Sequence, residues 1–301
     1  MILIFVLYAL YAAFFFINKI LAACAPPLLI IGARFFIAGL LLLGYYFFTG
    51  GRRVTLSARD WLWYLQMSLL SAFGSGILLI WAIKHISATK ACFIYTFGPF
   101  VTYLYSYVLF QEKMSVKKWL GLFVGFFGML PILLLNPSSE EITGGLFFKF
   151  LSLPEIATFL GVALFSYGWI GVQRFVRHRQ QAPTFINGLN MVIAGSVGIA
   201  CSLLLEQPIT IADHWAFWGW LALVIVCSNI IIYNLYAALL RTYTATFLSF
   251  ASFLSLLFSA LYGWLFFHER ITWHFFLTTI LLFSGLYIFY QEDFKKTGMT
   301  R

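Results

Sequence analysis

Long apolar runs separated by short polar breaks are the main pattern along the chain. A helix needs roughly 20 apolar residues to cross the hydrocarbon core of a bilayer, and most of the runs approach that length. Few runs keep the polar face that a helix in water would show. We predict transmembrane helices at 2–23, 28–48, 61–83, 89–110, 117–135, 153–175, 184–205, 216–239, 244–267 and 273–290. The pattern therefore predicts an all-α integral membrane protein with ten transmembrane helices.

Composition and charge agree with a membrane protein and predict its orientation. Hydrophobic residues make up 62% of the chain and charged residues 10%, which is far from the composition of a soluble domain. Most of the 19 Lys and Arg residues fall in the segments that share one side with the N-terminus. Because positive charge collects on the cytoplasmic side, we expect a cell (inner) membrane protein with both termini in the cytoplasm. The net charge of +9 is spread through short loops, so no nucleic-acid partner is expected.

One polar junction occurs twice, 157 residues apart. FQEKMS at 110–115 and FHERIT at 267–272 each follow an apolar run, and each carries a Glu followed by a basic residue. PLLIIGARFFIAG at 27–39 and PTFINGLNMVIAG at 183–195 share Pro, Gly, Ile, Ala and Gly in one register. Shared Leu and Phe would follow from composition alone, but these identities indicate an internal duplication.

The duplication divides the predicted helices into two sets of five. An odd number of crossings forces the second copy to enter the membrane from the opposite face, so the repeats are predicted to be inverted, as in carriers that work by alternating access. We expect a first repeat at 1–136, an external linker at 137–152, and a second repeat with a short cytoplasmic tail at 153–301. Glu112 and Glu269 are interpreted as structural, each near the N-terminus of the next helix.

These motifs resemble the drug/metabolite transporter superfamily, in particular its ten-helix EamA-type carriers. The resemblance covers nearly the whole chain and rests on the Pro-to-IAG segments, the SAT and TAT openings at 87–89 and 244–246, Pro99, and the two repeated junctions. The second half has Leu256 where Pro99 would be mirrored, so the two halves differ there. The resemblance implies a transporter with a central cavity lined mainly by helices 1, 3, 4, 6, 8 and 9.

Polar and aromatic residues inside the predicted helices are the candidates for substrate binding, because polar groups at bilayer depth are costly and tend to face the bundle interior. Asn229 and Tyr233 are four residues apart and would share one face of a regular helix. Asn side chains also join helices by hydrogen bonds, Lys residues anchor helix ends, and most aromatic residues simply pack. The candidates are Asn18, Lys19, Trp81, Lys90, Tyr95, Trp169, Gln173, Asn229 and Tyr233.

Arg34 has two interpretations. It lies about 10 Å into its predicted helix at 1.5 Å per residue, so its side chain would either reach the outer interface or contact substrate. The ten carboxylates fall in loops or at span ends, which favours exchange or facilitated movement over proton coupling. The four isolated Cys residues match no metal or redox motif, and no cofactor is expected.

The predicted function is a secondary transporter, an antiporter moving a small polar metabolite across the membrane. Basic, Asn and aromatic candidates favour an amino-acid-like or adenosyl-containing substrate, for example S-adenosylmethionine exchanged for S-adenosylhomocysteine. Amphiphilic drugs or aromatic amino acids are the alternative substrates, and a non-transporting scaffold or receptor is an alternative of another class. We find no H-E-x-x-H or G-x-S-x-G motif, so an enzyme is not expected. The lipid bilayer and the metabolite are the expected partners, with the protein a monomer or a homodimer.

Overall fold

The structure, a computed structural model, is built from helices. It describes residues 2–51, 54–86, 88–111, 113, 115–134, 152–206, 211–267 and 273–296, and no β-strand occurs among them. The α-helices are α1 (Ile2–Cys24), α2 (Pro27–Phe48), α3 (Ala58–Gln66), α4 (Ser75–His85), α5 (Ala88–Tyr95), α6 (Gly98–Phe110), α7 (Val116–Leu134), α9 (Leu153–Arg177), α10 (Pro183–Leu205), α11 (His214–Val224), α12 (Tyr233–Leu239), α13 (Ala245–Ala251), α14 (Leu254–Phe267) and α15 (Trp273–Lys296).

Eight helices within the described residues are long and apolar enough to cross a membrane. They are Ile2–Cys24, Pro27–Phe48, Ala58–His85, Ala91–Leu109, Leu153–Arg177, Pro183–Leu205, His214–Leu239 and Ala245–Tyr262. The prediction of an all-helical protein that crosses the membrane several times is therefore confirmed. The predicted spans 117–135 and 273–290 coincide with α7 and α15. Glu112, Glu269 and all of the predicted linker except Ser152 lie outside the described residues.

Local sequence signals set the helix starts. Pro27 and Pro183 are the first residues of α2 and α10, where the fixed φ of proline suits the first turn and its missing N–H is not needed. The side chains of Asp213 and Thr244 accept hydrogen bonds from backbone N–H groups in the first turns of α11 and α13, at 3.0 and 3.2 Å. These oxygens satisfy donors that have no partner within the helix.

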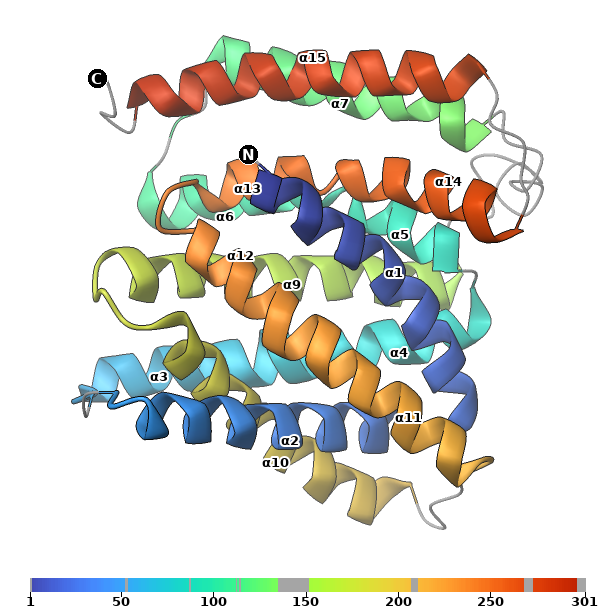
Figure 1. The fold of residues 1–301 in the computed structure, drawn as a ribbon. Helices are drawn as coiled ribbons and strands as arrows, with labels where there is room; N and C mark the ends of the chain where they lie inside the picture. The colour runs from blue at the N-terminus through green and yellow to red at the C-terminus, as the bar shows by residue number, and fades with distance from the viewer. Residues whose placement is uncertain are drawn as a thin grey trace.

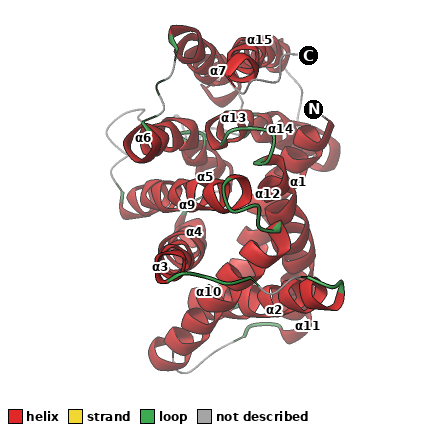
Figure 2. Cartoon of the chain, turned by 90° about the vertical axis from the view of Figure 1, so that its left-hand side faces the viewer, coloured by secondary structure: helices red, strands yellow, loops and turns green. Residues whose placement is uncertain are grey.

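Two helix pairs lie at opposite ends of the molecule, and Figures 1 and 2 show both. α2 runs along α10 at one end, and α7 runs along α15 at the other. Between the pairs lie α9, the α5–α6 rod and the α13–α14 rod, while α1 and α11–α12 cross them obliquely (Figure 1). Each pair joins a helix of the first half to a helix of the second.

Glycines bring the backbones of each pair into contact. A Cβ atom at Gly198 would lie 2.7 Å from the Cα of Gly32, and one at Gly285 would lie 2.5 Å from the carbonyl oxygen of Gly121. The hydrophobic effect does not drive two helices together in lipid, because the lipid tails are themselves apolar. Close van der Waals packing of the backbones is therefore a main source of stability for each pair. We call these two contacts the glycine seams.

The central helices depart from regular α-helix at positions that recur in the two halves. π-helical segments join α3 to α4 at Met67–Gly74 and α11 to α12 at Ile225–Ile232, 158 residues apart. Breaks separate α5 from α6 and α13 from α14, 156 residues apart. The sequence predicted regular helices there, and the prediction was wrong on this point. At the breaks the backbone bonds run from residue i+3 to residue i, as from Thr96 N–H to the Phe93 carbonyl at 2.9 Å.

A carboxylate joins the end of α10 to the start of α2. The Glu206 oxygens accept hydrogen bonds from the backbone N–H groups of Leu28 at 2.8 Å and Leu29 at 3.0 Å. Ser202 donates a further hydrogen bond to Glu206 at 3.0 Å. A negative charge here satisfies free N–H groups and interacts favourably with the positive end of the helix dipole.

We expect Glu206→Ala to lower the free energy of unfolding by about 1–2 kcal/mol, because α2 loses its N-terminal acceptor. Glu206→Gln keeps one carbonyl oxygen and should lose less. Thermal unfolding of the purified variants in detergent measures both. Wild-type stability of Glu206→Ala would show that neither oxygen supports α2.

Candidate functional site

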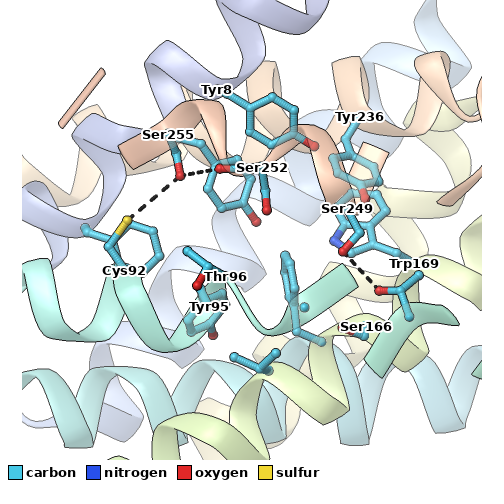
Figure 3. A pocket seen from close by; sticks show the side chains of 16 residues that line it. Tyr8, Cys92, Tyr95, Thr96, Ser166, Trp169, Tyr236, Ser249, Ser252 and Ser255 are labelled. Carbon is cyan, nitrogen blue, oxygen red and sulfur yellow. Dashed lines mark hydrogen bonds between the residues drawn. The ribbon is translucent and has the colours of Figure 1, made fainter. Parts of the chain in front are cut away.

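A central cavity lies where segments from both halves meet (Figure 3). Helices α1, α5, α6, α9 and α12–α14, with the breaks between them, provide its walls, and its free volume is about 40 Å³. The lining residues are Tyr8, Tyr11, Phe15, Cys92, Tyr95, Thr96, Gly98, Thr102, Val162, Phe165, Ser166, Trp169, Tyr236, Ser249, Ser252 and Ser255. This volume holds only a few water molecules. The helices therefore have to separate before a metabolite enters.

Aromatic rings form one wall of the central cavity. The Trp169 indole stacks on the Tyr236 ring with centroids 3.9 Å apart and planes at 29°. Phe165 makes edge contacts with Trp169 at 5.8 Å and with Tyr95 at 5.9 Å. Such ring faces bind flat groups by stacking and attract cations through the quadrupole of the ring.

Hydroxyl groups line the same cavity, at and beside the two helix breaks. Ser255 donates to the carbonyl of Ser252 at 2.6 Å, and Thr102 donates to the hydroxyl of Ser249 at 3.2 Å (Figure 3). A hydroxyl that donates one hydrogen bond still has lone pairs to accept another. These side chains therefore offer acceptors to the hydroxyl or amino groups of a ligand.

Trp169 also carries an unused donor. Its side chain is 4% exposed, and its Nε1–H has no hydrogen-bond partner in the described part of the chain. A buried N–H without an acceptor is unfavourable. A ligand acceptor that enters beside Trp169 would satisfy it.

The polar residues predicted at the end of the first helix lie apart from the cavity lining. Asn18 is buried, donates to the Phe14 carbonyl at 2.7 Å and accepts a bond from Arg34. The Lys19 ammonium donates to the carbonyls of Ile83 and, at 2.8 Å, Ile86. These carbonyls close the C-terminal turn of α4, where a cation is favourable.

Of the candidates predicted in the third and fourth spans, the structure places one in the lining of the central cavity. Tyr95 lines the central cavity. Trp81 is half-buried on α4, and its ring lies 4.8 Å from that of His85. Lys90 falls in α5, but its side chain lies outside the described part of the structure. Helix α4 contributes no residue to the cavity lining, although the family resemblance implied one.

The predicted residues of the second half lie at or near the cavity. Trp169 lines it, and Tyr233 packs beside Trp169 with ring centroids 5.4 Å apart. Gln173 accepts a hydrogen bond from the Ala245 N–H at 2.6 Å, which joins α9 to the start of α13. Asn229 is buried, its amide nitrogen lies 3.6 Å from the sulfur of Met191, and its Oδ1 has no partner among the described residues. It lies in a π-helical segment, so the regular helical spacing to Tyr233 does not apply.

Several lining residues were not among the sequence candidates. Tyr8 and Tyr11 look like ordinary packing residues in an apolar helix, and nothing in the sequence separates them from other aromatics. The serines did carry a signal, because Ser249, Ser252 and Ser255 recur every three residues. That spacing places polar groups on one side of a helix.

The comparison with known families gives the identity of the fold. The model of the EamA-like transporter family matches residues 1–134 and again residues 152–291. The chain belongs to the EamA-like transporter family. The two matches confirm the predicted two-repeat architecture and the resemblance drawn from the sequence. Both matched regions contribute residues to the lining of the central cavity.

Named relatives of this EamA-like chain are transporters. The S-adenosylmethionine/S-adenosylhomocysteine transporter of Chlamydia muridarum (strain MoPn / Nigg) is 31% identical over 233 residues, which cover 76% of this chain and 72% of that protein. The protein of the same name from Chlamydia trachomatis serovar L2 (strain ATCC VR-902B / DSM 19102 / 434/Bu) is also 31% identical, covering 76% of this chain and 70% of its own. A solved crystal structure, 15% identical, matches 98% of this chain and 96% of its own with a TM-score of 0.71, which supports the fold alone.

Proposed function

We propose that the protein exchanges S-adenosylmethionine for S-adenosylhomocysteine across the cell membrane by alternating access. The observation that carries the proposal is the combination of stacked aromatic rings and hydroxyl groups in the lining of the central cavity. Adenine would stack on the rings, the ribose hydroxyls would donate to the serine and threonine oxygens, and the sulfonium would face aromatic surface. The names of the relatives at 31% identity favour the same substrates.

The contracted cavity supports alternating access. A free volume of about 40 Å³ is too small for a nucleoside, so binding requires the walls to part. The helix breaks and π-helical segments recur in the two halves at shifts of 156 and 158 residues, and they supply matching points at which the halves would bend. We propose ten transmembrane helices in two inverted repeats, with the first repeat at 1–136, the linker at 137–152 and the second repeat at 153–301.

The proposed orientation places both termini in the cytoplasm. The α2–α3 turn, the α9–α10 turn and the C-terminal end of α15 lie on one side of the molecule, at the left of Figure 1. Arg177 and Arg179 fall at this side, as does Lys296. Excess Lys and Arg on one face marks the cytoplasmic side. One chain contains the whole central cavity, so a monomer would suffice for transport.

Reconstituted vesicles test the function. Vesicles containing the full chain and loaded with S-adenosylhomocysteine should take up labelled S-adenosylmethionine, and empty vesicles should take up much less. Unlabelled S-adenosyl compounds should compete, and nucleotide sugars should not. Competition only by aromatic amino acids or amphiphilic drugs would favour the alternative exporter. No uptake of any compound by folded protein would overturn the transport proposal.

A further inference from the structure

Arg34 is a buried cation for which the described residues provide no counter-ion. It is 2% exposed, so it does not reach the outer interface as one sequence interpretation expected. Its Nη1 donates to Asn18 Oδ1 at 3.1 Å, and its Nε has no hydrogen-bond partner among the residues that the structure describes. No carboxylate among the described residues interacts with it. Burying a charge without an opposite charge is strongly unfavourable.

Aromatic rings surround the guanidinium without completing its hydrogen bonds. Its central carbon lies 5.2 Å from the Phe14 ring centroid and 4.8 Å from that of Phe35. Ring faces attract a cation and offset part of the lost hydration. They are poor acceptors for the several N–H donors of a guanidinium, and these donors match the two oxygens of a carboxylate.

Aromatic rings connect Arg34 to the central cavity. Phe14, which contacts the guanidinium, lies 5.8 Å from Tyr11, and Phe35, which also contacts it, lies 6.2 Å from Tyr233, both between ring centroids. Tyr11 and Tyr95 line the cavity, and Tyr233 contacts Trp169, which also lines it. The positive charge therefore lies one layer of aromatic rings behind the cavity lining.

We propose that Arg34, with Asn18 and the hydroxyl of Tyr233, forms the binding site for the carboxylate of the transported metabolite. This inference rests on the proposed function. It adds that the protein recognises the carboxylate at the amino-acid end of the substrate. The adenosyl end lies on the aromatic wall beside Trp169, and the amino-acid end reaches Arg34. Substrates that lack a carboxylate leave the buried cation unpaired, so the site selects against them.

Paired ligands with and without the carboxylate test this assignment. We expect the wild-type protein to bind S-adenosylmethionine at least about thirtyfold more tightly than decarboxylated S-adenosylmethionine. A loss of this size is typical when one partner of a buried charge pair is removed. Arg34→Gln should remove this ratio while leaving the affinity for methylthioadenosine, which has no amino-acid end, unchanged. Arg34→Lys should keep part of the ratio. Arg179→Gln, at a side chain that is 51% exposed and paired with Asp60, is the matched control and should behave as wild type.

Each other outcome is decisive. Equal wild-type affinity for the two forms overturns the inference, and this comparison holds even if Arg34→Gln does not fold. An equal loss for methylthioadenosine in Arg34→Gln makes Arg34 a purely structural residue. If the wild-type protein binds no adenosyl compound, the proposed function fails, and the same comparison between phenylalanine and phenethylamine decides the role of Arg34 separately. A preference for phenylalanine that Arg34→Gln removes supports it, and equal binding or no binding of the two overturns it.

Discussion

Gly39→Leu is expected to abolish most of the folded protein. Gly39 lies on α2 against α10, where a Cβ atom would stand 2.6 Å from the Val192 nitrogen and 2.9 Å from the Gly188 carbonyl oxygen. Both are backbone atoms, so no side-chain rotation relieves the overlap, and the two helices must move apart. We expect a loss of about 3 kcal/mol or more in the free energy of unfolding.

The same helix provides the control for this substitution. Gly44 is also on α2, and a Cβ there meets no atom of the described part of the chain within 4 Å. Gly44→Leu should therefore keep wild-type yield and thermal unfolding in detergent. Unfolding of Gly39→Leu at the wild-type temperature would show that α2 and α10 are not in backbone contact.

Trp169→Leu is expected to weaken binding of S-adenosylmethionine by about 5- to 150-fold, since stacking of a base on an aromatic side chain contributes roughly 1–3 kcal/mol. The substitution removes both the ring that stacks on Tyr236 and the unpaired Nε1–H. Trp169→Phe keeps a ring but no donor, so its affinity should lie between the two. Calorimetric titration of the purified variants gives the three affinities.

A lipid-facing tryptophan separates this effect from general loss of stability. Trp218 on α11 is 51% exposed and lines no part of the central cavity. Trp218→Leu should retain wild-type affinity. If Trp169→Leu binds S-adenosylmethionine as tightly as Trp218→Leu does, the aromatic wall is not the adenosyl site.

The positions of the helices were predictable because the bilayer imposes a length on every span. Predicted bounds such as 28–48 and 153–175 differ by only one or two residues from Pro27–Phe48 and Leu153–Arg177. The two-repeat organisation was also predictable, since a polar junction repeated among apolar residues cannot come from composition. Tyr95 and Trp169 were named from sequence and line the central cavity.

The backbone irregularities and the aromatic wall were not predictable from one sequence. In an apolar segment such as Ile225–Ile232, hydrophobicity is high at nearly every position, so no period distinguishes a π-helix from an α-helix. Tyr8 and Tyr236 stand among many aromatics that only pack. The burial of Arg34 depends on Asn18, Phe14 and Tyr233, which come together only when three helices meet.

The glycine seams have a consequence for the two halves as separate polypeptides. α2 and α7 belong to the first half, and each lies along a helix of the second half, α10 or α15. If the first half were synthesised alone, the glycine faces of α2 and α7 would lie against lipid and would lack the backbone contacts that α10 and α15 make. Neither half is therefore expected to fold stably when it is expressed by itself. Two separate polypeptides, one for each half, should give folded protein only when they are produced together.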